Sequence, residues 1–320
     1  MNTKSSIVIF CYVNMLCLAA DIYYVDGVLI PAYAVAINEQ IDMTPSVDLA
    51  KPAMKVNRYI FDTSWGPFEV GYSRYLNSSV QWQGKYGASI NSDMGLGIPG
   101  YDWNWYRGNT LRVKVDGNDI IALKDADTVD WQDGDSIIAR WRGVWKTDHG
   151  NMLIYIVVID GLDTALVEVE FDGIAETIEL LLTCYPGGMG PAYGHASLRS
   201  VEAGGQTVEV GTGQYGEQMQ ILAGVSEIFY SDRWSETHGM GSSGACGLYF
   251  LSDTISSGTI DVGSYVVTTH LCLHKDSKVA RFALTGYEVP NSLARKCFFD
   301  SRSEIKRLLK TTQFYKEVKR

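Results

Sequence analysis

Hydrophobic and polar residues alternate along much of the chain beyond position 110. Leu111, Val113 and Val115, for example, alternate with Arg112 and Lys114. A period of two places successive side chains on opposite faces of a strand, so this pattern predicts strands with one face in a core. Similar strand-like runs lie at 152–159, 165–171, 206–210, 227–230, 247–251, 264–274 and 279–284.

Asp-Gly pairs separate several of these runs. They occur at 116–117, 160–161 and 172–173, and Asp-Gly between two apolar runs is a strong signal for a tight β-hairpin. Each pair therefore predicts that the runs on its two sides form antiparallel strands. Many short strands with turns between them, and no fixed-period repeat, indicate an all-β fold. We expect one domain over 21–299, a large antiparallel β-sandwich, with a barrel as the alternative.

The first twenty residues have a different pattern. Lys4 precedes an apolar run over 7–18, and small residues follow it. A short positive segment, an apolar stretch and a small-residue end are typical of a secretory signal peptide, which predicts a signal over 1–20. The alternative is a buried N-terminal strand. With the signal, we expect the protein to be secreted, periplasmic or at the cell surface. No stretch is long enough to predict an integral membrane span.

The last residues predict the one helix. Ser301 and Glu304 have the spacing of a capping box, and Ile305, Leu308 and Leu309 follow at helical spacing. We therefore expect an amphipathic helix within 300–320 that packs on the sandwich. Because the segment is basic, binding to an anionic membrane surface is the alternative.

Charge divides the chain into parts. The 320 residues carry a net charge of −10, and 46% of them are hydrophobic, which is a globular composition. Residues 291–320 contribute +6, so the body over 21–290 is more acidic than the total, at −17. An acidic body repels phosphate backbones, which argues against nucleic acid as a partner. It also accommodates a neutral or basic ligand more easily than a polyanion.

Cysteines bear on the expected compartment. Cys11 and Cys17 would leave with the signal. The remaining four, Cys184, Cys246, Cys272 and Cys297, allow three disulfide connectivities, among which the sequence does not choose. Free buried thiols are the alternative, because a domain of this size folds without cross-links. The number of chains in the assembly is left open as well.

One strand carries a possible metal site. If 264–274 is an uninterrupted strand, His270, Cys272 and His274 point to the same face, a donor set that suits zinc. The alternative is a packed or partly solvated strand face, and no cofactor is required by the pattern. An Asp-rich run over 125–135 has oxygen ligands for calcium, but its spacing is not that of an EF-hand.

Paired carboxylates are present on another predicted strand. Glu168 and Glu170 share one face, at a separation that glycosidase acid–base pairs also use. The residues between and beside them are apolar, and this alternation predicts instead that the two carboxylates lie on a solvated outer face.

Two Gly-rich loops hold candidate catalytic groups. The first, over 185–195, contains His195, and the second, over 231–239, contains Glu236 and His238. A histidine paired with Glu236 or Asp232 forms a workable acid and base near neutral pH. Ordinary surface loops are the alternative.

Aromatic residues suggest a binding platform. Trp103 and Trp105 alternate and would share one strand face, where flat rings stack on sugar C–H faces. Core packing is the alternative. From the two loops we add Tyr193, Arg233 and Trp234 as candidate substrate-binding residues.

The chain as a whole resembles the galactose-mutarotase-like β-supersandwich of carbohydrate-active proteins. The resemblance covers 21–299 and rests on layout: an aromatic-rich first half, late Gly-rich loops with His and Glu, and a closing strand followed by a helix. It implies a protein that handles carbohydrate, either as an epimerase, hydrolase or lyase with His/Glu acid–base chemistry, or as a non-catalytic binding or cell-surface protein. In the epimerases of this family a His acid and a Glu base act on the anomeric centre.

Overall fold

The structure is a computed structural model, and it describes most of the chain beyond position 110. The described ranges are 111–120, 127–133, 138–159, 164–184, 186, 196–211, 214, 216–234, 245–264, 266–287 and 291–315, together with the backbone of six strands between 23 and 83. The predicted signal peptide over 1–20 lies outside the described residues.

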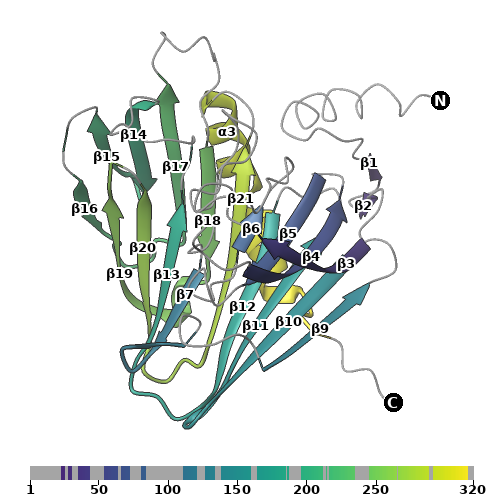
Figure 1. The fold of residues 1–320 in the computed structure, drawn as a ribbon. Helices are drawn as coiled ribbons and strands as arrows, with labels where there is room; N and C mark the ends of the chain where they lie inside the picture. The colour runs from purple at the N-terminus through teal and green to yellow at the C-terminus, as the bar shows by residue number, and fades with distance from the viewer. Residues whose placement is uncertain are drawn as a thin grey trace.

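Two antiparallel sheets face each other and form the sandwich (Figure 1). Nine of the described strands make the larger sheet, in the order β15 (Gln206–Gly211), β14 (Ala196–Ala203), β17 (Glu227–Trp234), β18 (Ala245–Phe250), β21 (Val279–Tyr287), β12 (Thr164–Gly173), β11 (Gly150–Ile159), β10 (Ile138–Thr147) and β9 (Thr128–Asp133). Six make the smaller sheet, in the order β16 (Glu217–Gln220), β19 (Ile255–Val262), β20 (Val267–Leu273), β13 (Ile178–Cys184), β7 (Leu111–Val115) and β8 (Asn118–Asp119). The predicted all-β sandwich is confirmed.

The N-terminal strands form smaller sheets of their own. β3 (Val35–Met43), β4 (Met54–Thr63), β5 (Gly66–Tyr72) and β6 (Gln81–Gln83) pair in that order, and β1 (Tyr23–Val25) pairs with β2 (Val28–Ile30). β3 contacts β9 and β10, so this sheet lies beside the far edge of the nine-stranded sheet.

The main core lies between the two large sheets. Strands β7 and β20 show strict alternation, with every second residue buried. Trp145, Ile154, Val167 and Phe282 come from the nine-stranded sheet and have almost no exposed surface. The apolar residues that alternate in the sequence are therefore the ones buried in this core between the sheets.

Helix α3 (Asn291–Thr311) covers the other face of the nine-stranded sheet and makes a second core. The helix contacts β17, β18 and β21. Phe298, Ile305 and Leu309 pack there against Leu166 and Tyr249 of the sheet. Because its central strands are buried on both faces, they read as continuous apolar runs: all six residues of β18 are buried.

The helix begins before its predicted start. We placed the helix within 300–320, with Ser301 as the N-cap, but α3 begins at Asn291. The Ser301 hydroxyl donates to the carbonyls of Cys297 and Phe298, one turn back in the same helix. Ser301 therefore lies inside the helix and bonds to the preceding turn, which imitates a cap signal in the sequence.

Of the three predicted hairpins, the one at 116–117 is confirmed and the one at 172–173 is wrong, while the turn at 160–161 lies outside the described residues. Asp116 and Gly117 both have positive φ, at 50° and 80°, and connect β7 to β8 as a tight hairpin. Gly173, in contrast, is still paired with Gly150 at the end of β12. The chain then leaves the nine-stranded sheet and enters β13 of the other sheet. Two Asp116 hydrogen bonds support this crossing, accepted from the backbone of Glu176 and Thr177 at 2.8 Å.

The basic helix is held to the acidic body by ion pairs as well as by apolar contacts. Lys306 pairs with Glu227, and Arg295 pairs with Glu202 at 2.6 Å. Among the described residues, no helix combines the length and the apolar character that crossing a membrane requires.

Candidate functional site

The two candidate loops are attached to neighbouring strand ends. The predicted start of the second loop at 231 is wrong, because 231–234 are the last residues of strand β17. β14 begins at Ala196, directly after the segment 185–195, and β17 ends at Trp234, directly before the segment 235–244. Ala196 and Trp234 are Cα partners in the ladder between these strands. The strand ends to which the two segments are attached therefore lie side by side in the nine-stranded sheet, where β14 and β17 stand at the upper left of Figure 1.

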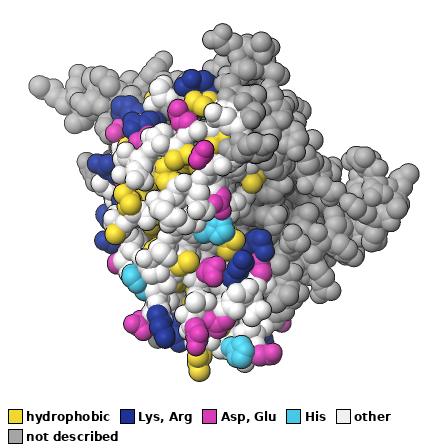
Figure 2. All heavy atoms as spheres, turned by 90° about the vertical axis from the view of Figure 1, so that its left-hand side faces the viewer, with side chains coloured by type: hydrophobic (Ala, Val, Ile, Leu, Met, Phe, Trp, Pro, Cys, Tyr) yellow, Lys and Arg dark blue, Asp and Glu magenta, His cyan; other side chains and the backbone are white. Residues whose placement is uncertain are grey.

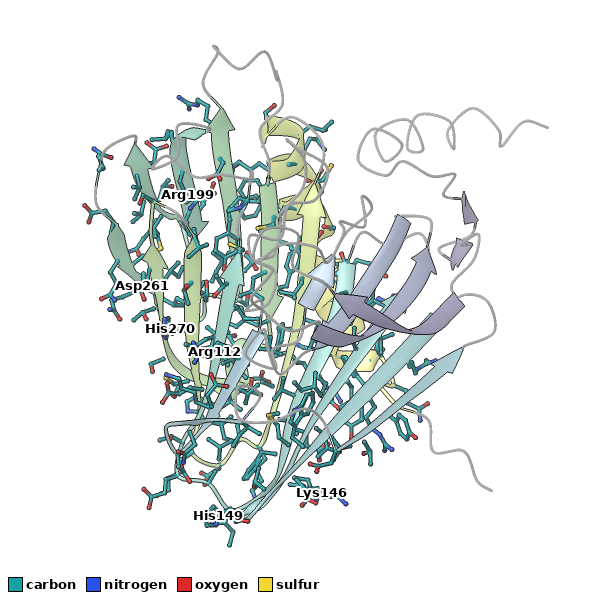
Figure 3. The ribbon with its side chains drawn as sticks, in the orientation of Figure 1. Arg112, Lys146, His149, Arg199, Asp261 and His270 are labelled. Carbon is teal, nitrogen blue, oxygen red and sulfur yellow. The ribbon has the colours of Figure 1, made fainter. Side chains whose placement is uncertain are left out.

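A buried ion pair lies directly beneath these strand ends. Arg199 and Asp232 are register partners on β14 and β17, and neither side chain is exposed. Arg199 Nε donates to Asp232 Oδ1 at 2.8 Å, and Nη2 donates to Oδ2 at 2.7 Å. Such a bidentate pair offsets much of the cost of removing two charges from water. Figure 3 labels Arg199 in the upper part of the sandwich.

Arg199 also connects the two sheets. Its Nη1 donates to the carbonyl of Gly263 at 3.1 Å, just beyond the end of β19 in the six-stranded sheet. Beside it, Tyr230 Oη and Thr269 Oγ1 lie 2.7 Å apart and link β17 to β20. These bonds fix the position of one sheet relative to the other at the end of the sandwich to which the candidate loops are attached.

Two thiols complete this cluster. Cys184 ends β13 and Cys246 lies in β18, and both are buried free cysteines. Burial raises the pKa of the Cys246 thiol well above its usual range, and a hydrogen bond with Cys184 raises it further. Burial likewise raises the pKa of Tyr230. We call the whole group the inter-sheet polar cluster: Cys184, Arg199, Tyr230, Asp232, Cys246 and Thr269.

The cluster changes the expected role of Asp232. The sequence offered its carboxylate as a partner for a loop histidine. In the structure both carboxylate oxygens accept hydrogen bonds from Arg199, and the side chain is fully buried. Asp232 therefore anchors β14 to β17 and is not available as a partner for a loop histidine.

Most of the predicted site residues lie outside the described residues. This holds for the catalytic candidates His195, Glu236 and His238, and for the ring candidates Trp103, Trp105 and Tyr193. Trp234 is described by its backbone alone. Arg233 is exposed, and because it follows the buried Asp232 along the strand, its side chain is on the opposite face of the sheet. The structure thus brings together the strand ends to which the loop candidates are attached.

The predicted metal ligands lie on the outer face of the six-stranded sheet. β20 ends at Leu273, so His274 comes after the strand, and His274 is exposed. His270 Nε2 lies 3.2 Å from Asp261 Oδ2 on the neighbouring strand. Figure 3 labels both residues. Within the described part of the chain, no three His, Cys, Asp or Glu side chains gather as metal ligands do. The metal site stays a prediction.

This outer face is polar and mixed in charge. Figure 2 shows acidic, basic and histidine side chains scattered among uncharged and hydrophobic ones. Gln218 Nε2 donates to Asp261 Oδ1 at 2.7 Å, so the carboxylate beside His270 is shared between two neighbours.

The alternation predicts that Glu168 and Glu170 lie on a solvated face of the sheet. In the structure this face is covered instead. That face of β12 is the one on which the C-terminal segment lies. Glu168 is only 8% exposed and pairs with Arg281, whose Nη1 donates to the carbonyl of Leu309 at 3.2 Å. Burial raises the pKa of Glu168, and Arg281 opposes that shift.

Aromatic residues of the C-terminal segment close this second polar group. The guanidinium of Arg142 lies 4.1 Å from the centroid of the Tyr315 ring, and Arg281 lies 5.1 Å from that of Phe314. Burial and the nearby Glu170 raise the pKa of Tyr155 to about 12. The group is thus a contact between the sheet and the chain's own C-terminal segment.

Sequence reasoning missed Arg199 as a structural residue. A signal for it was present, because Arg199 shares a strand face with the apolar Val201 and Ala203. Asp232 likewise shares a face with Ile228 and Tyr230. A lone charge on an apolar strand face, with an opposite charge on another such face, predicts a buried ion pair.

Several solved structures are similar to this chain in layout. A proposed aldose 1-epimerase from Klebsiella pneumoniae aligns with a TM-score of 0.45 and 11% identity, over 86% of this chain and 93% of that one. A TPR-domain containing protein from Parabacteroides distasonis has a TM-score of 0.45 and 7% identity, over 81% of this chain and 54% of that one. An alpha-N-acetylgalactosaminidase from Bifidobacterium bifidum has a TM-score of 0.43 and 12% identity, over 84% and 39%. No protein family and no curated protein sequence matches the chain.

Proposed function

We propose that this protein handles carbohydrate at the loop end of the sandwich, where the segments 185–195 and 235–244 leave adjacent strands. The observation that supports this proposal most directly is the pairing of Ala196 with Trp234 above a buried Arg199–Asp232 ion pair. Because this frame is rigid, groups on the two loops start from fixed, neighbouring positions. Functional groups of antiparallel β proteins commonly lie on such loops.

The proposed chemistry is acid–base catalysis on a sugar. His195 directly precedes Ala196, and Glu236 and His238 follow closely after Trp234 in the sequence. In this proposal a histidine donates a proton to a sugar oxygen, and Glu236 removes one from a hydroxyl. Both steps need groups within hydrogen-bond reach of the substrate.

The binding residues in this proposal are rings and one cation. Trp103, Trp105, Tyr193 and Trp234 would stack on the apolar faces of sugar rings, while Arg233 would bind hydroxyl oxygens. We propose in addition that the protein is exported, with residues 1–20 as its signal. The alternative function is binding without catalysis, in which the histidines and Glu236 take no part.

The test separates catalysis from binding. Anomeric interconversion of free hexoses is followed by exchange NMR, and binding is followed on a glycan array. His238→Gln and Glu236→Gln are expected to lower an epimerase rate about 100-fold or more while retaining binding. Trp103→Ala is expected to lower binding.

The matched control is His270→Gln, since His270 is a half-exposed histidine on β20 of the six-stranded sheet, whereas β14 and β17 belong to the nine-stranded sheet. It should change neither readout. Binding without interconversion, or without cleavage of the glycans bound, would support the non-catalytic alternative. Absence of binding to any glycan by the wild type would overturn the proposal as a whole.

A further inference from the structure

We propose that Cys184 and Cys246 form an inter-sheet disulfide when the chain folds under oxidising conditions. This inference goes beyond the proposed function and does not depend on it. It rests on how the two large sheets face each other at the loop end, and it assigns a covalent modification to two residues of the inter-sheet polar cluster.

The two cysteines come from opposite sheets and face the same core. Cys184 is the last residue of β13 in the six-stranded sheet, whereas Cys246 lies in β18 of the nine-stranded sheet. Both belong to the core between these sheets, with 1% and 0% of their surface exposed. A bridge between them would therefore cross the sandwich from one sheet to the other.

The strand register places them next to the closest polar contact between the sheets. Cys246 is the register partner of Tyr230, and Thr269 is the partner of Leu182, which lies two residues before Cys184. Tyr230 Oη and Thr269 Oγ1 meet at 2.7 Å. The neighbours of the two cysteines thus already touch across the core, and each cysteine lies within two residues or one register step of that contact.

The other described cysteines leave this pair as the one that can bridge the sheets. Cys272 is free, but it alternates with the buried Leu271 and Leu273 and so lies on the outer face of the six-stranded sheet. Cys297 lies in helix α3, on the far side of the nine-stranded sheet. Neither can reach Cys184 or Cys246 without passing through a sheet.

The chemistry favours oxidation during folding over oxidation of the finished core. A thiolate is the attacking species in thiol–disulfide exchange, and burial disfavours it. In the open chain, a Cys184 or Cys246 thiolate attacks a small-molecule disulfide such as oxidised glutathione, which releases one glutathione thiol and leaves a mixed disulfide. The second cysteine then displaces the other glutathione. Two electrons and two protons leave the protein, and two glutathione thiols form.

Such a bridge would fix the bases of both candidate loops. Cys184 directly precedes the segment 185–195, and Cys246 follows the segment 235–244 by one residue. The disulfide would join the strand that enters the first loop to the strand that leaves the second. In the chain-entropy account, closing a loop of this length favours folding roughly a thousandfold.

The experiment is refolding of the full-length chain with oxidised and reduced glutathione, and in parallel with an excess of reduced dithiothreitol. Each sample is then unfolded, its free thiols are alkylated, and the peptides are mapped by mass spectrometry. The expected result is a linked Cys184–Cys246 peptide pair in the oxidised sample only. Recovery of both cysteines in alkylated form from the oxidised sample would overturn the proposal, as would linkage of either one to Cys272.

Variants measure the effect on folding. The gain in stability is the fold-decrease in the unfolding equilibrium constant on going from reducing to oxidising conditions, and it is compared in the wild type, Cys246→Ala and Cys272→Ala. Because the other cysteines of the full-length chain also respond to these conditions, the informative quantity is the difference between variants. Cys272→Ala should keep the full gain and Cys246→Ala should lose most of it; equal gains in both variants would contradict the proposal. If Cys246→Ala does not fold, peptide mapping of the wild type still decides.

Discussion

Arg199 and Asp232 show how a single pair of residues positions the loop end of this protein. Each lies on a strand face that otherwise points into the apolar core, and each is fully buried. A buried charge without a partner is far more costly than a paired one, so each residue lowers the free-energy cost of burying the other. The strand pairing of β14 with β17 at this point therefore depends on both.

Replacement of one partner should be more harmful than replacement of both. Asp232→Asn leaves the Arg199 charge buried with a weaker acceptor, and we expect a loss of about 3–5 kcal/mol in the free energy of unfolding. The double variant Arg199→Met with Asp232→Leu is expected to lose less, since it buries no charge. Chemical denaturation of the two variants measures this, and a loss in the double variant as large as or larger than the loss in Asp232→Asn would contradict the expectation.

At the scale of elements, helix α3 and the nine-stranded sheet fit because a glycine leaves room for a ring. Phe298 stacks on Tyr249, with ring centroids 4.4 Å apart, and Tyr249 Oη donates to the Phe298 carbonyl at 2.6 Å. A Cβ atom at Gly247 would overlap the Phe298 ring and approach Thr285. Gly247 thus sets how closely the helix approaches β18.

Gly247→Ala is expected to destabilise the protein by about 1–3 kcal/mol, because the added methyl group overpacks this interface. In a Phe298→Ala background the same change should be close to neutral, since the ring that it would meet is absent. Thermal or denaturant unfolding of the four proteins in this cycle gives the coupling energy. An equal cost of Gly247→Ala in both backgrounds would contradict the assigned contact.

At the scale of the whole molecule, the nine-stranded sheet is the middle of three layers. One face packs on the six-stranded sheet, and the other packs on helix α3 and on Phe314. The ion pairs of Lys306 and Arg295 with the acidic body orient the helix, while apolar burial supplies most of its attachment. Loss of the helix layer would expose a large apolar sheet surface.

Two substitutions in helix α3 serve as test and control for this layer. Ile305 is 1% exposed, so Ile305→Asp places a carboxylate in the second core and should release the helix, with binding of a hydrophobic dye and self-association. Arg302 is exposed, and Arg302→Asp should leave both properties near those of the wild type. Size-exclusion chromatography with dye fluorescence measures both, and equal behaviour of the two variants would show that the helix is dispensable for covering the sheet.

Local patterns were sufficient for the fold class and for most strands beyond position 110. Alternation along 111–115 and 267–273 predicts the faces that are in fact buried, because strand side chains alternate whatever their partners are. The Asp116–Gly117 turn was equally local, since it depends on backbone conformation. The start of α3 was missed because Ser301 bonds within the helix in a way that resembles a cap.

The sequence by itself determined an antiparallel all-β chain with a basic helix at its C-terminal end, because periodicity, turn residues and charge act between near neighbours. Only the tertiary structure decided which strands lie opposite each other. That choice placed Glu168 under the C-terminal segment, joined Arg199 to Asp232, and brought Cys184 to Cys246 across the core. These contacts join residues far apart in the chain, and their energies depend on burial that no local pattern specifies.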